Sequence, residues 1–196
     1  ASGADVVFLQ EVDSGRITSF QVDHAYWLAS ELGWHQLFAP TLEGLSGIAM
    51  ISRYPLQDSS VEMLTSSGEQ TALASARIRL GSQSVALHTM WLGLDTTERM
   101  IQINDAVSNI KGDDLAILGG DFNSEPGSEE IELIESLGYS DIAVDLKADD
   151  LMTDPAVDPD SRIDYLFSRG LEPIMYTVWP QVISDHRMVV SSMQIP

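Results

Sequence analysis

The chain has 196 residues, of which 44% are hydrophobic and 20% charged, a composition that is typical of a globular protein and excludes a disordered one. Thirty acidic residues against ten Lys and Arg give a formal net charge of −20, which argues against broad electrostatic binding to nucleic acid, because such binding depends on basic side chains. The absence of cysteine excludes disulfides, thiol nucleophiles and thiolate metal sites.

Apolar runs and turn residues along the chain predict a layered α/β fold. We expect strands over 6–9, 47–52, 74–80, 84–89, 115–118 and 163–167, a strand toward 178, and a last strand over 188–190. Helical spacing predicts helices over 21–32 and 96–110, with Thr96 or Thr97 as the cap of the second. A third, short helix is expected to follow Ser128 and to end at Gly138.

The sequence contains no repeat and no linker-like stretch, so we expect a single domain over residues 1–196. No apolar run has the length needed to span a bilayer, and the first residues do not resemble a signal peptide. We therefore expect a soluble protein without a transmembrane segment, whose compartment and oligomeric state the sequence leaves undetermined.

Polar and acidic residues repeatedly follow the apolar runs. The set consists of Glu11, His88, Asp121, Asn123, Asp164, Asp185 and His186. Burying a single carboxylate costs several kcal/mol unless a cation or a hydrogen-bond donor compensates it, so one such residue is most simply a structural cap. Four carboxylates with two imidazoles and an amide instead indicate hard oxygen ligands for Mg²⁺ beside groups for acid–base chemistry.

Five stretches that contain most of these residues follow one another in a familiar order. They are DVVFLQEVD (5–13), GIAMISRYPL (47–56), LAILGGDFNSEPGS (115–128), RIDYLF (162–167) and SDHRMVV (184–190). Together they resemble the endonuclease/exonuclease/phosphatase superfamily of deoxyribonuclease I-like phosphoesterases. The resemblance implies a two-sheet α/β sandwich, Mg²⁺ (or Mn²⁺) as cofactor, and hydrolysis of a phosphodiester or phosphomonoester by in-line attack of water.

The same resemblance implies a role for each matching residue. Glu11 corresponds to the metal-binding glutamate, and Asp185 to a ligand or water-mediated neighbour of the metal. Asp121 corresponds to the residue that orients or deprotonates the attacking water, and Asn123 to a residue that holds the phosphate.

The resemblance also implies a histidine that faces the scissile phosphate. His186 corresponds to it, with Asp164 as the carboxylate that orients its ring. Arg187 directly follows this histidine and is a candidate to clamp a phosphate oxygen.

Several positions depart from the family pattern. The family's first strand carries a site asparagine, and that strand is expected to be absent from this chain. Ile48 stands where close relatives often have asparagine, and Met188 where proline is usual.

A further family histidine maps onto Trp91 without gaps or onto His88 after a short shift, and side chains at these two positions point to opposite faces of a strand. We predict that His88 faces the phosphate, because an imidazole stabilises phosphoryl charge and an indole does not.

Other polar residues have simpler interpretations. His24 and His35 are interpreted as surface or packing residues. The acidic residues of 145–160, Asp154 among them, lack the spacing of a calcium loop and are interpreted as a solvated loop that borders the substrate cleft at most.

The net charge of −20 favours a small or lipid-derived phosphoester over duplex nucleic acid as the substrate. The alternative hypothesis is a family member that has lost activity and works as a binding module, because Trp91 and Ile48 replace residues of the family site.

Overall fold

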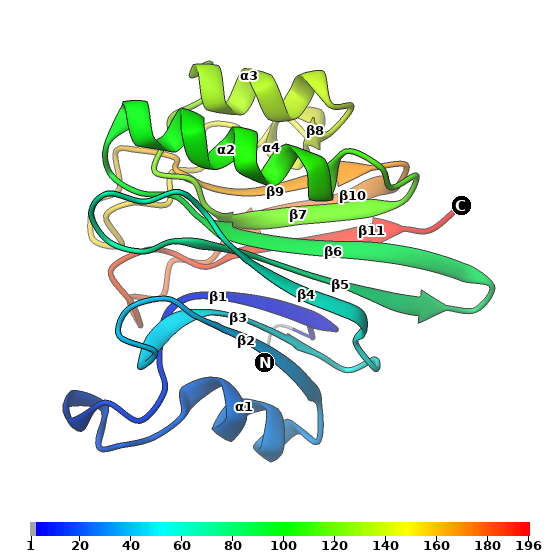
Figure 1. Cartoon of the computed structure of the whole chain (residues 1–196). Helices are drawn as coiled ribbons and strands as arrows, with labels where there is room; N and C mark the ends of the chain where they lie inside the picture. The colour runs from blue at the N-terminus through cyan, green and yellow to red at the C-terminus, as the bar shows by residue number, and fades with distance from the viewer. Residues whose placement is uncertain (1–2) are drawn as a thin grey trace.

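A computed structural model describes residues 3–196. The elements form four layers, in which α2 and α3 cover one face of a large sheet, a smaller sheet packs on its other face, and α1 covers the smaller sheet (Figure 1). The large sheet has the order β4 (Gln57–Met63), β5 (Ala72–Leu80), β6 (Gln83–Trp91), β7 (Ala116–Asp121), β9 (Asp164–Arg169), β8 (Ser140–Asp141). The expected two-sheet α/β sandwich is confirmed.

The second layer of strands consists of two separately hydrogen-bonded sheets. One has the order β1 (Val6–Asp13), β3 (Ser46–Ser52), β2 (His35–Pro40), and the other is the hairpin of β10 (Glu172–Val178) and β11 (Val189–Gln194). The helices are α1 (His24–Leu32), α2 (Thr96–Ile110), α3 (Glu129–Ser136) and α4 (Ile142–Asp145), with a 3-10 turn η1 (Ile17–Ser19).

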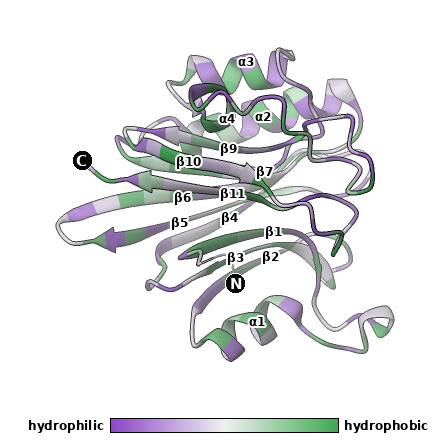
Figure 2. Cartoon of the chain, turned by 180° about the vertical axis from the view of Figure 1, so that it is seen from behind, coloured by the Kyte–Doolittle hydropathy of each residue, from purple (hydrophilic) through white to green (hydrophobic). Residues whose placement is uncertain are grey.

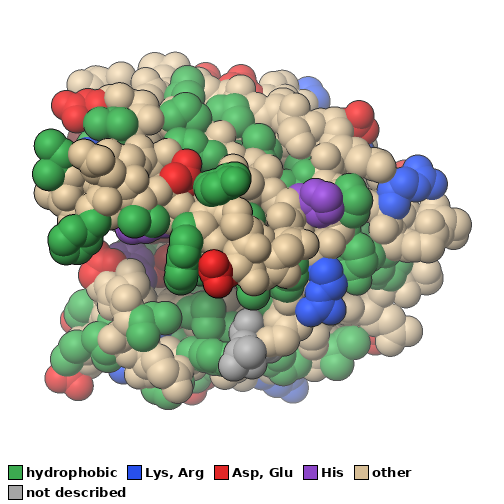
Figure 3. All heavy atoms as spheres, turned by 90° about the horizontal axis from the view of Figure 1, so that it is seen from below, with side chains coloured by type: hydrophobic (Ala, Val, Ile, Leu, Met, Phe, Trp, Pro, Cys, Tyr) green, Lys and Arg blue, Asp and Glu red, His purple; other side chains and the backbone are tan. Residues whose placement is uncertain are grey.

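Two hydrophobic cores hold the layers together. The first lies between the large sheet and its helices and contains Met90, Ile103, Leu118 and Phe122. The second lies between the sheets, where Met50, Ile78 and Leu87 pack together. Helices α1 and α2 carry hydrophilic and hydrophobic stripes, as expected for helices with one face on a core (Figure 2). Viewed from below, the surface is hollowed at its left edge, with histidine and acidic side chains in the hollow (Figure 3).

The expected strands and helices all form, and their caps differ in detail. The cap of α2 is Asp95 and neither threonine, because the Asp95 carboxylate accepts the backbone N–H of Glu98 at 3.0 Å. Ser128 occupies the N-cap position of α3, although its side chain makes no capping hydrogen bond. Strands β2, β4 and the two-residue β8 were not predicted from the sequence; β4 is a mostly exposed edge strand without an apolar run.

Two successive glycines of β7, Gly119 and Gly120, lie where a side chain would not fit. A Cβ added at Gly119 would lie 2.9 Å from the ring of Phe8 in β1, and one added at Gly120 would lie 1.9 Å from the Met90 carbonyl oxygen. Gly120 also has a φ of 149°, which L side chains rarely adopt. Gly119 lets Phe8 of β1 pack closely across β7, Gly120 lets β7 lie against the backbone of β6, and Asp121 follows them directly.

The structure contradicts the prediction that His88 faces the phosphate. Along β6, Leu87 packs in the core between the sheets, whereas Ala86 and Met90 pack under the helices. His88 therefore points toward the helix layer, away from the strand-end carboxylates. The apolar face of β6, which carries Leu87 and Trp91, is the one that meets the second sheet.

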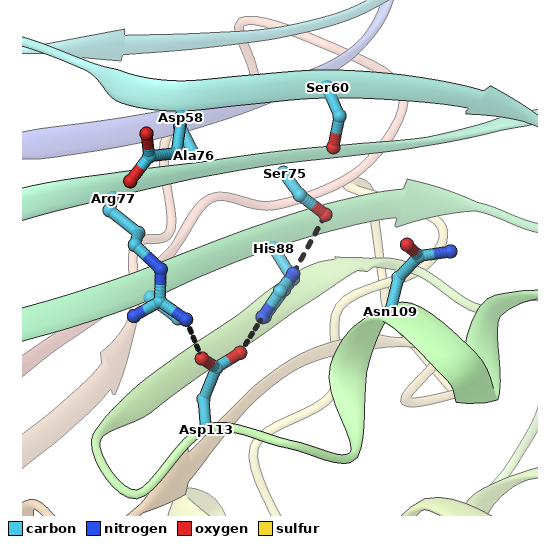
Figure 4. Close-up of a pocket in the computed structure, with 9 residues that line it drawn as sticks. Asp58, Ser60, Ser75, Ala76, Arg77, His88, Asn109 and Asp113 are labelled. Carbon is cyan, nitrogen blue, oxygen red and sulfur yellow. Dashed lines mark hydrogen bonds and ion pairs between the residues drawn. The ribbon is translucent and has the colours of Figure 1, made fainter.

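His88 instead belongs to a buried polar network between β5, β6 and the turn after α2 (Figure 4). Its Nδ1 lies 2.8 Å from the Ser75 hydroxyl oxygen and its Nε2 lies 3.2 Å from Oδ2 of Asp113, which also forms an ion pair with Arg77. Burial lowers the pKa of His88, and the neighbouring Asp113 only partly opposes this effect. The network lines a polar cavity of about 140 Å³.

We predict that Gly120→Ala lowers the free energy of unfolding by about 3 kcal/mol or more, because the new Cβ overlaps a backbone carbonyl that is fixed in the sheet. Gly68→Ala is the matched control, since a Cβ there has no atom within 4 Å. Urea unfolding measures both variants, and equal stability of the two would contradict the close approach at Gly120.

We also predict a pH-dependent contribution of His88 to stability. The folded protein holds the pKa of His88 below its ordinary value of 6.5, so the neutral ring stabilises the fold above that pH, and this stabilisation is lost as the pH falls from 6.5 toward the folded-state pKa. The free-energy advantage of the wild type over His88→Gln should therefore shrink between a pH of about 7.5 and about 5. His35→Gln, at an exposed histidine of β2, is the control. An advantage that stays constant or grows at low pH would show that the sign is wrong.

Candidate functional site

Three of the residues predicted for the site converge at one end of the two sheets. Asp121 ends β7 and Asp164 begins β9, and the two are direct partners in the antiparallel pairing. His186 comes from the loop between β10 and β11. One ligand atom from each of the three side chains lies within 4.8 Å of the other two.

His186 lies between two carboxylates. Its Nδ1 is 3.0 Å from Oδ2 of Asp164, and its Nε2 is 3.3 Å from Oδ1 of Asp154. The hydrogen bond to Asp164 outweighs partial burial and raises the pKa of His186 to about 9. The ring is therefore protonated at neutral pH and donates from Nδ1 to Asp164, the orientation that the family resemblance implies.

Asp154 is a site contact that the sequence analysis placed in a solvated loop. The loop is not loose, because the backbone groups of Asp154 and Ser161 form hydrogen bonds with each other across an isolated bridge. This bridge holds the Asp154 carboxylate close to the His186 imidazole. No spacing in the sequence distinguishes Asp154 from the other acidic residues of this loop.

Asp121 and Asn123 form a tight turn after β7. The backbone N–H of Asn123 donates to Oδ1 of Asp121 at 2.9 Å, and its side-chain Nδ2 donates to the Leu92 carbonyl at 2.8 Å. Burial, and next the like charge of Asp164, raise the pKa of Asp121 to about 7. A carboxylate with such a pKa is suited to accept a proton from water near neutral pH.

Glu11 reaches the same region from the smaller sheet. The pairing of β1 with β3 shifts register between Leu9 and Val12, and within this bulge Glu11 has a φ of 52°. A bulge redirects side chains away from the regular alternation of a strand. Partial burial and the negative charge of Asp185 raise the pKa of Glu11, so these two carboxylates from distant segments lie near each other.

The donor set fits a hard divalent cation. Glu11, Asp121, Asp164 and Asp185 supply carboxylate oxygens, the ligands that Mg²⁺ and Mn²⁺ prefer. Burial raises the pKa values of Glu11 and Asp121 first, and repulsion from Asp185 and Asp164 respectively adds to the effect; a nearby cation would oppose both causes. Assignment of Glu11 and Asp185 as the metal ligands remains a prediction.

Arg187 braces the loop that carries Asp154. Its backbone N–H donates to the Thr153 carbonyl at 2.8 Å, and its Nε donates to the Ala156 carbonyl at 2.8 Å. This attachment fixes the chain directly after His186. Its predicted role as a phosphate clamp remains a prediction.

Trp91 occupies the site face of β6, beside Asp121 in the parallel pairing of β6 with β7. It packs in one hydrophobic cluster with Ile48. The two departures from the family pattern are therefore in the same cluster, and they form an apolar wall next to the carboxylates. The Trp91 indole N–H is buried and has no hydrogen-bond partner among residues 3–196.

Two further contacts that the sequence did not reveal support the site. Gln10 Nε2 donates to the Thr89 hydroxyl at 3.0 Å, which ties the two sheets together one residue before Glu11. The Tyr165 hydroxyl donates to the Ser124 carbonyl at 2.9 Å and fixes the turn that contains Asn123.

Comparisons with known structures give the same fold. The endonuclease/exonuclease/phosphatase protein of Beutenbergia cavernae aligns with a TM-score of 0.77 at 20% identity, over 99% of this chain and 63% of its own. The mannosyl-6-phosphatase of Bacteroides thetaiotaomicron aligns with a TM-score of 0.77 at 15% identity, over 96% of this chain and 85% of its own. The catalytic domain of human Nocturnin, solved with a bound sulfate anion, aligns with a TM-score of 0.74 at 21% identity, over 97% of this chain and 81% of its own.

Among the described residues, no helix is both long and apolar enough to cross a membrane.

The chain spans less than two thirds of the length of the Beutenbergia cavernae protein. The sequence profile of the Endonuclease/Exonuclease/phosphatase family matches residues 1–186. The chain therefore belongs to the endonuclease/exonuclease/phosphatase family, whose members are hydrolases that act on phosphoesters.

Proposed function

We propose that this protein is a metal-dependent phosphoesterase that hydrolyses a phosphodiester or phosphomonoester by in-line attack of water. The observation that carries the proposal is the convergence of Asp121, Asp164 and His186, with ligand atoms within 4.8 Å of one another. The charges of Asp185 and His186 both act on the pKa of Glu11, which supports assigning Glu11 and Asp185, from two other segments, to the same site.

The residues divide the chemistry by their charge states. Asp121, with a pKa of about 7, orients the attacking water and accepts its proton. His186, protonated and oriented by Asp164, places a positive charge beside the phosphoryl oxygens as negative charge grows on them, and its longer contact from Nε2 to Asp154 would give way to the substrate. A divalent cation held by Glu11 and Asp185 would neutralise charge on the phosphate and the leaving oxygen.

Asn123 has a supporting role in this proposal. Its amide is bound to the Leu92 carbonyl, which holds the turn after β7 rigid and keeps Asp121 aimed at the site. The same amide nitrogen also donates to Oδ2 of Asp121 at 3.4 Å, and this longer contact is the one that a phosphate oxygen would replace.

We predict that Glu11→Gln weakens binding of Mg²⁺ or Mn²⁺ at least tenfold, because one charged ligand is lost while a side chain of the same shape remains. Isothermal titration with Mg²⁺, and the rise in melting temperature that Mg²⁺ produces, measure this independently of activity. Glu43→Gln, at an exposed glutamate of the β2–β3 turn, is the control and should bind as the wild type does. Hydrolysis that persists unchanged in excess chelator would overturn the metal requirement.

We predict that His186→Ala lowers kcat on the order of 10²- to 10⁴-fold, the range for a positioned acid or base. Asp164→Asn should cost less, and the double variant should be no slower than His186→Ala, because Asp164 acts through the imidazole. Bis(4-nitrophenyl) phosphate and 4-nitrophenyl phosphate, with Mg²⁺, are the substrates, and His35→Ala is the control. Fully additive losses would separate the two residues, and an inactive but folded wild type that still binds phosphate would support the binding-module alternative.

A further inference from the structure

The loops that carry the site also carry very exposed hydrophobic side chains. Phe20 is 91% exposed, Ile17 85%, Leu94 84% and Ile183 81%. With the less exposed members they form what we call the apolar rim, which consists of Ile17, Phe20, Leu45, Leu94, Val157, Val182 and Ile183. A soluble protein rarely leaves so many large apolar side chains uncovered around one opening, and such patches usually mark an interaction surface.

Three members of the rim lie next to site residues in the sequence or through a hydrogen bond. Ile183 lies two residues before Asp185, and Val157 follows Ala156, whose N–H donates to the Asp185 carbonyl. Leu94 lies two residues after Leu92, which accepts the amide of Asn123. In Figure 1 the η1 loop, the β6–α2 loop and the β10–β11 loop all lie at the left end of the sheets, where the site residues converge.

The remaining members project from beyond the end of β1. The turn around η1 is closed by backbone hydrogen bonds from Phe20 to Ile17 and from Gln21 to Arg16. Phe20 and Gln21 have φ values of 57° and 62°, an unfavourable conformation for residues other than glycine. The turn thus holds an aromatic side chain outward at a conformational cost, whereas a loose loop would let the ring fold back onto the protein.

The charges on these loops restrict what can cover the rim. Glu43, Asp95 and Asp158 are exposed on the same loops, and the chain carries a net charge of −20. An anionic membrane would repel this face. A zwitterionic bilayer presents cationic ammonium groups at its outer surface, which complement the acidic residues, and apolar chains beneath them, which accept the hydrophobic side chains.

The position of the rim around the site selects between a lipid surface and a folded partner. A protein seated on the rim would close the opening to the carboxylates, whereas a bilayer presents a phosphodiester to the opening at the same time as it covers the apolar side chains. This step rests on the proposed phosphoesterase function.

We propose that the apolar rim inserts into the surface of a zwitterionic phospholipid bilayer, and that the site acts on the headgroup phosphodiester of a lipid in that surface. The rim binds the interface and the carboxylates perform the hydrolysis. Docking and chemistry are therefore separable by mutation.

The test is co-sedimentation of the whole protein with phosphatidylcholine vesicles and with phosphatidylglycerol vesicles, with Mg²⁺ present. The wild type should bind the zwitterionic vesicles more tightly than the anionic ones. The double variant Phe20→Ser/Ile183→Ser should lose about tenfold or more of this affinity, because two apolar side chains no longer enter the bilayer. The control is Ile174→Ser/Val144→Ser, which removes two exposed apolar side chains outside the rim and should bind as the wild type does.

Hydrolysis separates the failure of this inference from failure of the proposed function. The rim variant should hydrolyse water-soluble bis(4-nitrophenyl) phosphate as the wild type does, yet lose most hydrolysis of phosphodiester lipids in vesicles. Wild-type protein that cleaves the soluble diester but does not bind phosphatidylcholine vesicles, or binds phosphatidylglycerol vesicles better, would overturn the inference alone. Protein that cleaves neither substrate would overturn the proposed function, and a dimer that the rim substitutions dissociate in solution would assign the rim to a second copy of this chain.

Discussion

Two carboxylates in register on neighbouring strands, Asp121 and Asp164, are the costly feature around which the rest of the site is arranged. Both face the interior between the sheets, where like charges repel strongly because little water screens them. Protonated His186 offsets part of that cost through Asp164, and the raised pKa of Asp121 shows that part remains. Under the proposed function, a cation would offset this remaining repulsion and then favour an anionic substrate.

The fold can maintain this arrangement because its supports lie outside the reacting groups. Gly119 lets β1 approach β7, Gly120 lets β7 lie against the Met90 backbone of β6, and the hydrogen bond between Gln10 and Thr89 fixes one sheet against the other. Asp154 and the attachments of Arg187 hold His186 from the loop side. The segments that carry Asp121, Asp164 and His186 are therefore held by separate contacts, which keeps these charged side chains close together.

The site is asymmetric in polarity. On the β7–β9 side it is acidic and matches the family pattern, whereas on the β3–β6 side Ile48 and Trp91 form an apolar wall. The apolar rim adds further hydrophobic side chains outside the opening. An acidic site with apolar surroundings suits the proposed substrate, a phosphate attached to a hydrophobic body, and the net charge of −20 disfavours binding of polyanions.

The sequence by itself determined the family and the layered α/β order, and it predicted Glu11, Asp121 and Asp164 as site residues, because each lies at an end of a short apolar run. The sequence did not determine the direction in which the His88 side chain points, because that depends on which face of β6 meets the second sheet. It also did not reveal Asp154, which resembles its acidic neighbours until a bridge to Ser161 brings it to the imidazole. Strand alternation gives two faces but does not say which one the site uses, and only the packing of one sheet on the other decides that.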